Sequence, residues 1–185
     1  MVTTMSFQLP SIEKLPREVQ KKLKKLPQIN LYETLAAGYP KGFNQIIDFI
    51  ATFYNDDSKV APRLREIGIL RIARNTKSAY EAHQHYYLSK ATGITDKEYD
   101  IIKSTEITTE FTDEENLICK VADELCSKFA ISDATYNELY SSFETQAAIE
   151  IILCLSMYMQ VACIINATRI KIEEDTPLKN QNKPL

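Results

Sequence analysis

The sequence predicts an all-α protein that forms a single helical domain of about eight or nine helices. Strand signals are almost absent, because no alternating run of Val, Ile, Thr and aromatic residues ends in an Asn-Gly or Asp-Gly turn. Glycine occurs only 4 times in 185 residues, so few positions suit left-handed backbone. Signals for helix starts, by contrast, recur along the chain. The length fits about one domain, at roughly 150 residues per domain.

Proline and apolar spacing predict three helices in the first half of the chain. Pro16 begins PREVQKKLKKL and Pro62 begins PRLREIGILRIARNT, and proline suits the first position of a helix. The segment 42–56 is also expected to be helical. It places these apolar residues on one face: Phe43, Ile46, Ile47, Ile50 and Phe53.

Capping boxes mark three further helix starts. In each, Ser or Thr precedes a glutamate by three residues, so that the two residues can satisfy each other's backbone N–H groups. Gly93 is expected to end the first of these helices. The pairs are Ser78–Glu81, Thr95–Glu98 and Thr112–Glu115.

A long apolar helix is expected from its cap, Thr145, to about Thr168. Residues 147–167 are long enough to cross a membrane, but Glu150 and three other polar residues interrupt them. A glutamate in hydrocarbon would cost a few kcal/mol. We therefore interpret this segment as a core helix that also meets another subunit, and we expect no membrane partner.

Charge and composition argue against several functions. The formal net charge is −3, so no basic field would attract nucleic acid. The KKLKK run at 21–25 is interpreted as a solvated helix face. We divide the chain into an N-terminal extension with a short basic helix (1–29), a helical domain (30–175) and a flexible tail (176–185). The first dozen residues and those after Glu174 are expected to be loosely held.

Neither a cofactor nor a metal is expected. The 4 cysteines form no C-x-x-C pair, and the only histidines are His83 and His85. No glycine-rich nucleotide-binding motif occurs. The opening MVTTMSFQLP has neither a basic nor an apolar region of the kind found in signal peptides. These features predict a cytoplasmic protein with free, mostly buried thiols.

The stretch 63–93 holds the candidate chemistry. Glu81 and His85 lie four residues apart on one expected helix, so their side chains are neighbours. A carboxylate beside an imidazole is typical of a general acid–base pair. If the NTK turn folds the two helices antiparallel, Glu66 comes near Glu81. One of two adjacent carboxylates then has a raised pKa.

A purely structural interpretation of these residues also exists, and spacing alone favours it. Glu81 would bond the start of its own helix as part of the Ser78 capping box. His83 lies on another face of the helix and is the weaker candidate. A polar stripe in this helix would face solvent; it consists of Glu81, His85, Ser89 and Thr92.

The motif in this stretch resembles the carboxymuconolactone decarboxylase family, which belongs with the alkylhydroperoxidase D-like (AhpD-like) proteins. The pattern is R-x-R-E-x-x-I-L-R-x-A-R, then S-x-Y-E-x-x-x-H and a glycine eight residues later. The resemblance continues through FTDEENLICKVADEL into the last apolar helix and covers about residues 30–175. It implies the helical AhpD-like fold and an obligate homo-oligomer, either a trimer or a hexamer.

The peroxidase branch of this superfamily carries a C-x-x-C motif. Its two cysteines correspond here to Ser78 and Glu81, its tyrosine to Tyr80, its histidine to His85 and its upstream glutamate to Glu66. A peroxide-reducing dithiol cycle needs two thiols, and both are missing. The chain is therefore not expected to be a thiol peroxidase of that type.

The decarboxylase branch has the Y-E-x-x-x-H form found here, and its reaction removes CO2 from a carboxylated γ-lactone. The resemblance implies that His85 transfers the proton, that Glu81 orients it and that Glu66 tunes the pair. An anionic substrate also needs a cation, for which Arg71, Arg74 and protonated His85 are candidates. Weaker pocket candidates are Tyr80, Ser78, Arg74 and Tyr158, together with Gln160.

One departure from the branch concerns the residue after the glutamate. Tryptophan is frequent there, whereas this chain has Ala82 and no tryptophan at all. The exchange is expected to enlarge or reshape the pocket.

Three functions stay open at this point. The first is a lyase that acts on a small carboxylated lactone, or a related acid, through Glu66, Glu81 and His85. The second is an oxidative-stress protein with altered redox chemistry, which requires an exposed and reactive thiol. The third is a non-catalytic oligomeric binding protein.

Overall fold

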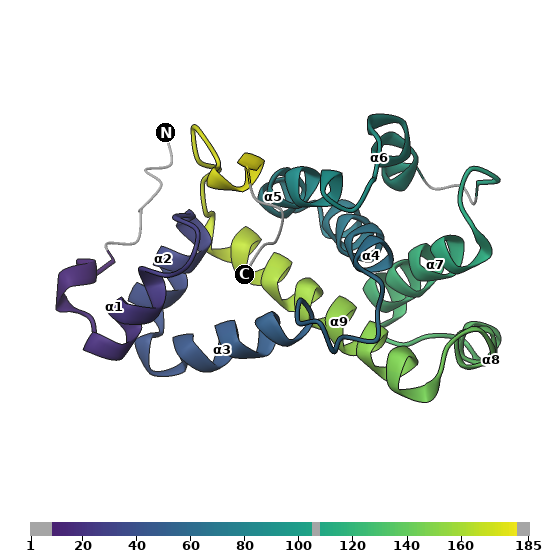
Figure 1. The fold of residues 1–185 in the computed structure, drawn as a ribbon, viewed down its shortest axis with the longest axis horizontal. Helices are drawn as coiled ribbons and strands as arrows, with labels where there is room; N and C mark the ends of the chain where they lie inside the picture. The colour runs from purple at the N-terminus through teal and green to yellow at the C-terminus, as the bar shows by residue number, and fades with distance from the viewer. Residues whose placement is uncertain (1–8, 105–107, 181–185) are drawn as a thin grey trace.

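The computed structural model describes residues 9–104 and 108–180. Within these residues the chain forms nine α-helices and two short 3-10 helices, and no strand (Figure 1). The prediction of an all-α fold is confirmed. The elements are η1 Ile12–Lys14, α1 Arg17–Leu23, α2 Asn30–Gly38, α3 Pro40–Thr52, α4 Pro62–Asn75, α5 Ala79–Lys90, α6 Asp96–Lys103, α7 Asp113–Lys128, α8 Asp133–Ser142, α9 Thr145–Thr168 and η2 Pro177–Asn180.

Helix α4 lies at the centre of the fold. It packs against α5, α6, α7 and α9, and every residue from 64 to 73 is buried. Gly68 permits this close approach, because a Cβ atom there would lie 2.5 Å from a methyl carbon of Leu155 on α9 and 3.0 Å from one of Ile118 on α7. In Figure 1, α1 to α3 gather at one end of the molecule and α6 to α8 at the other, with α9 running between them.

Helices α4 and α5 form an antiparallel pair, as predicted. The Ser78 N–H donates to the Ala73 carbonyl beside the turn, and Arg63 at the far end donates to the Gly93 carbonyl. Between these two contacts, Glu66 on α4 faces His85 on α5. The register of this helix pair therefore decides which side chains meet in the interior.

The predicted caps are confirmed for two helices and corrected for two. Thr95 with Glu98 and Thr112 with Glu115 form reciprocal capping boxes. Ser78 accepts from the Glu81 N–H, but the Glu81 carboxyl does not return the bond. The predicted cap of the long helix, Thr145, is instead its first helical residue, preceded by Glu144.

The two ends of the described chain join the domain more closely than expected. Val19 and Leu23 of α1 are buried, and α1 packs against α2 and α3. The expectation of a loosely held tail is wrong for Thr176 and Leu178, which are 2% and 3% exposed. Their burial follows from packing on α5. The parts of the two loosely held ends that fall on residues 1–8 and 181–185 lie outside the described residues.

Helix α9 is long and apolar enough to cross a membrane by length and composition. One of its faces packs against α4, α5, α7 and α8, as a core helix does. Burial is nevertheless incomplete, because Ile149 and Leu153 are 45% and 47% exposed. The side chains of Met157 and Ile164, further along the helix, are half-buried.

We expect this exposed face of α9 to support self-association. Light scattering should give a native mass above the 21.2 kDa of one chain. A double substitution, Ile149→Glu and Leu153→Glu, should lower that mass, because it places charges in an apolar contact. A monomeric mass for the unmodified protein would contradict the prediction.

Candidate functional site

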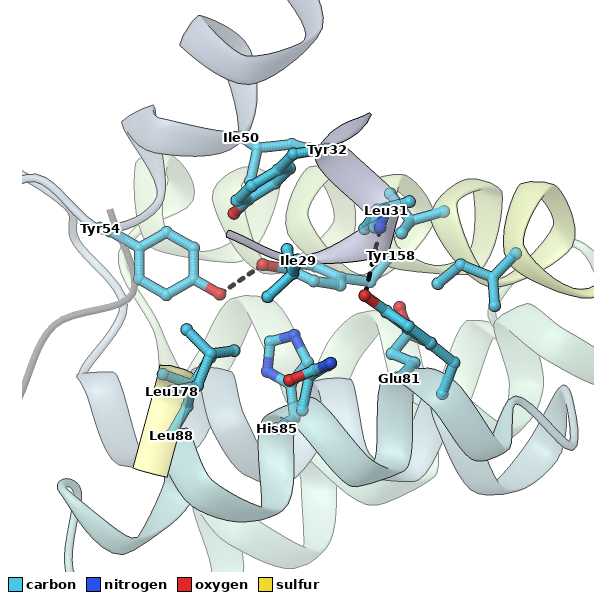
Figure 2. Close-up of a pocket in the computed structure, with 14 residues that line it drawn as sticks. Ile29, Leu31, Tyr32, Ile50, Tyr54, Glu81, His85, Leu88, Tyr158 and Leu178 are labelled. Atoms are coloured by element: carbon cyan, nitrogen blue, oxygen red, sulfur yellow. Dashed lines mark hydrogen bonds between the residues drawn. The ribbon is translucent and has the colours of Figure 1, made fainter. Parts of the chain in front are cut away.

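A small, largely apolar cavity lies where α5 faces the beginning of α2 and the second half of α9. Its volume is about 50 Å³. Figure 2 shows Glu81 and His85 reaching from one helix toward Leu31 and Tyr158 on the opposite side. The cavity is lined by Ile29, Leu31, Tyr32, Ile50, Tyr54, Tyr80, Glu81, Gln84, His85, Leu88, Tyr158, Val161, Ile165 and Leu178.

Glu66 and His85 form a buried pair beside this cavity. His85 Nδ1 lies 2.8 Å from Glu66 Oε2, and the two side chains are 8% and 1% exposed. The expectation that Glu81 orients His85 is wrong, because the antiparallel register brings Glu66 to the ring instead. When Glu66 is ionised it only accepts, so Nδ1 carries the proton and Nε2 is the ring nitrogen left for a ligand.

Arg65 supplies the cation of this cluster, and the sequence analysis missed it. Its Nε lies 3.4 Å from Glu66 Oε1, and its Nη1 donates to the Phe53 carbonyl at 2.7 Å. Its guanidinium also lies 4.0 Å from the centre of the Tyr54 ring. Consecutive helix residues do not face each other, so helical spacing alone carried no signal for the Arg65–Glu66 contact.

The arginines chosen from the sequence serve other contacts. Arg71 forms a two-pronged ion pair with Asp123 and donates to the Ile102 carbonyl. Arg74 donates to the Lys103 carbonyl and to Asn75. Neither arginine lines the cavity, because both project from α4 toward the side that α6 and α7 cover.

Ser78 and Ala82 also lie away from the cavity. Both line a separate groove on the other side of α5 that includes Arg74 and Tyr99. Ser78 acts as the helix cap. The expectation that Ala82 reshapes the pocket is therefore not met directly, because its side chain faces that groove.

Glu81 is the one member of the predicted cluster that has no partner. Its side chain is buried at 2% exposure, and neither carboxyl oxygen has a hydrogen-bond partner within the described part of the chain. Burial raises the pKa of Glu81 well above its ordinary value of 4.5, so the carboxyl group is held neutral. The structural interpretation of Glu81 as part of a capping box is wrong.

Tyr54 and Tyr158 bond to each other through their hydroxyl groups at the edge of the cavity. The Tyr158 ring also meets His85 edge-to-face, with ring centres 5.0 Å apart. Burial raises the pKa of both phenols, which keeps them neutral. Tyr158 lines the cavity. Gln160 lines a different hollow, between α2, α3 and α9.

The C-terminal segment 171–179, which we call the strap, closes the cavity. Its Glu173 carboxylate accepts from the Tyr80 hydroxyl at 2.6 Å and from Gln84 Nε2. Thr176 Oγ1 donates to Gln84 Oε1 at 2.5 Å. Leu178 then contributes an apolar side chain to the cavity wall. Tyr80 thus lines the cavity as predicted, but its hydroxyl is committed to the strap.

A larger cleft of about 600 Å³ adjoins the cavity. Tyr54 and Leu88 line both spaces and so form part of the wall between them. Arg65 and Glu66 line the cleft as well. The Arg65–Glu66 part of the cluster therefore faces the cleft, while His85 faces the cavity.

Three of the four thiols are poorly suited to nucleophilic chemistry. Burial raises the pKa of Cys119 to about 12 and that of Cys126 to about 11, and it also raises the pKa of Cys154. Thiols with raised pKa values are poor sources of thiolate. Cys163 is exposed. Among the described residues, no group of three or more His, Cys, Asp or Glu residues could hold a metal ion.

Comparison with solved structures places this fold among known proteins. No protein-family model and no curated protein sequence matches the chain. A crystal structure of an alkylhydroperoxidase AhpD core, an uncharacterized peroxidase-related protein from Ralstonia eutropha JMP134, matches with a TM-score of 0.79 at 13% identity over 95% of each chain. An uncharacterized peroxidase-related protein from Silicibacter sp. TM1040 matches with a TM-score of 0.79 at 15% identity, over 99% of this chain and 100% of the other. The chain therefore has the AhpD-like fold.

The unpartnered Glu81 carboxyl should make folding stability depend on pH. The unfolded chain releases this proton near pH 4.5, whereas the folded protein retains it, so stability falls as the pH rises above 4.5. The Glu81→Gln variant lacks this titration. The unfolding free energy of the wild type relative to the variant should therefore fall by up to about 1.4 kcal/mol per pH unit. Urea unfolding from about pH 5 to about pH 8 measures it, and a constant difference would contradict the assignment.

Removal of the Glu173 carboxylate, which holds the strap on α5, should destabilise the fold. Glu173→Ala takes away an acceptor shared by Tyr80, Gln84 and the Asn30 N–H, and we expect a loss of about 1–3 kcal/mol in unfolding free energy. Hydrogen exchange should also accelerate within residues 171–179. Glu174→Ala is the matched control, since this neighbouring glutamate is exposed. Equal effects of the two substitutions would contradict the role of Glu173.

Proposed function

We propose that the protein is a carboxy-lyase that removes CO2 from a small carboxylated lactone. The observation that carries this proposal is the buried Glu66–His85 bond at the edge of an apolar cavity. A histidine held by a carboxylate is suited to proton transfer. The resemblance of the Y-E-x-x-x-H motif to the decarboxylase branch supports the same reaction class.

In the proposed reaction, the bond between the ring carbon and the carboxylate breaks and CO2 leaves. The electron pair passes into the conjugated lactone, and one proton then adds to carbon. For this step His85 must be in its imidazolium form, with a proton on each ring nitrogen: Nε2 delivers its proton to the carbon, Nδ1 stays bonded to Glu66, and Nε2 takes up another proton from solvent before the next turnover. The Arg65 guanidinium lies on the other oxygen of Glu66 and offsets the negative charge of that carboxylate.

The aliphatic lining of the cavity would favour loss of CO2. A carboxylate is strongly solvated in water, and the neutral CO2 that it becomes is not. Residues such as Ile29, Val161 and Ile165 offer that carboxylate no polar contact. A carboxylated lactone is larger than the closed cavity, so the proposal requires movement of the strap or of the wall formed by Tyr54 and Leu88.

A thiol-based peroxidase function has less support. The two positions that carry the redox cysteines in the peroxidase branch are occupied here by Ser78 and Glu81. Cys154 is buried and its pKa is raised by that burial. Within the proposal the protein acts in the cytoplasm as a homo-oligomer, a trimer or a hexamer, without a bound cofactor.

The test is CO2 release from γ-carboxymuconolactone. His85→Ala should lower the rate by about a hundredfold or more, which is the contribution expected of a general acid. His83→Ala is the matched control, because this second histidine on α5 contacts Tyr87 and does not line the cavity. Both variants are compared with the wild type at equal native mass.

Two outcomes would reject the proposal. The first is a wild type that releases no CO2, which would leave a binding protein as the alternative. The second is an equal loss of rate in the His83 and His85 variants.

A further inference from the structure

One hydrogen-bonding group of the cavity has no function in the fold. Glu81 is buried, lines the cavity and bonds to nothing with either carboxyl oxygen among the described residues. We infer that the Glu81 carboxyl group donates a hydrogen bond to the carbonyl oxygen of the bound ligand, which makes the ligand a lactone, ester or ketone. This inference rests on the proposed function and adds the residue that would hold the carbonyl oxygen of the lactone.

Four other polar groups of the cavity are already committed. The hydroxyls of Tyr54 and Tyr158 bond to each other. Tyr80 and Gln84 bond to Glu173 of the strap. Among the described residues, a ligand in the cavity therefore meets three uncommitted polar groups, which are the Glu81 carboxyl, Nε2 of His85 and the hydroxyl of Tyr32. Of these, the Glu81 carboxyl is the one whose oxygens are fully buried without a partner.

The protein itself offers no structural use for the Glu81 carboxyl. A surface capping box would bring the side chain back to its helix start, as Glu98 and Glu115 do on their helices. Glu81 instead points into the interior, as Figure 2 shows. Buried polar groups in native proteins nearly always have a partner, and a ligand would supply the missing one.

The chemistry of the donor selects a carbonyl compound. A neutral carboxylic acid has one O–H donor, and a carbonyl oxygen is a complementary acceptor. Among the lining residues only His85 can carry a positive charge, and the nearby Arg65 guanidinium is occupied by Glu66, Phe53 and Tyr54, so Glu81 is left to bind an uncharged carbonyl group rather than a carboxylate. A cationic amine would instead require Glu81 to ionise inside an apolar cavity, which burial opposes.

This contact would also assist the proposed reaction. When the bond to the carboxylate breaks, the electron pair that remains is delocalised onto the lactone carbonyl oxygen. A hydrogen-bond donor placed at that oxygen stabilises the charge that develops there. Glu81 keeps its proton throughout, His85 delivers the one proton that the carbon takes up, and CO2 is the leaving group.

Binding of γ-butyrolactone tests the inference without any turnover, because this lactone has no carboxylate to lose. Its labelled carbonyl carbon is followed by NMR during titration with the full-length protein. Tetrahydrofuran, a ring of similar size without the carbonyl, and pyrrolidine, its amine counterpart, are the comparison ligands. We expect the lactone to bind most tightly and its carbonyl resonance to shift.

Substitutions then locate the contact. Glu81→Met should weaken lactone binding by about tenfold, as expected for one lost hydrogen bond inside a cavity. Tetrahydrofuran binding should change little. Glu81→Gln keeps a hydrogen-bond donor of similar size and should retain part of the affinity for the lactone. This variant also provides a test if Glu81→Met does not fold. Glu114→Gln, an exposed glutamate on α7, is the control.

Three results would overturn the inference. They are unchanged lactone affinity in both Glu81 variants, equal affinity of the wild type for lactone and tetrahydrofuran, and preferred binding of pyrrolidine. Failure of the proposed function is distinguishable from these. If the lactone binds through Glu81 but no CO2 is released from γ-carboxymuconolactone, the ligand class stands and the lyase reaction does not.

Discussion

Burial of residues 64–73 of α4 imposes a condition on every polar side chain within that stretch. A charged side chain inside a protein is costly unless it finds a partner there. Arg71 meets this condition with Asp123 and the backbone around Ile102. Arg65 meets it with the Phe53 carbonyl and the Tyr54 ring, and Glu66 meets it with Arg65 and His85. The pairing of α4 with α5 supplies the partner of Glu66 and thereby creates the candidate site.

Glu81 stands out because it fails the condition that its neighbours meet. A buried group without a partner lowers stability, and proteins keep such groups mainly where function requires them. The neutral acid lies on the same helix as His85, one turn away, and lines the same cavity. A charge-neutral donor and a charge-tunable imidazole are a useful combination, because one can polarise an oxygen while the other moves a proton.

Local sequence signals predicted most helices but not the packing of the C-terminal segment. Caps, prolines and apolar spacing located seven of the nine α-helices in the described residues but not α2 and α8. Pro62 and the Thr95 and Thr112 caps lie where they were expected. The tail after residue 175 was misjudged because Thr176 and Leu178 acquire their burial only by packing on a distant helix. A segment rich in polar residues and proline carries no local sign of such a contact.

The sequence by itself determined the all-helical class, the absence of the C-x-x-C pair and the candidate set of Glu66, Glu81 and His85. Spacing along one helix correctly identified which residues share a face. It could not identify which carboxylate meets His85, because that depends on the register between two helices across a turn. The tertiary structure decided that contact in favour of Glu66 and left Glu81 alone in the cavity. The tertiary structure also identified Arg65 as the cation of the site. Arg65 is next to Glu66 in the sequence, but only the packing around α4 places its guanidinium beside the Glu66 carboxylate.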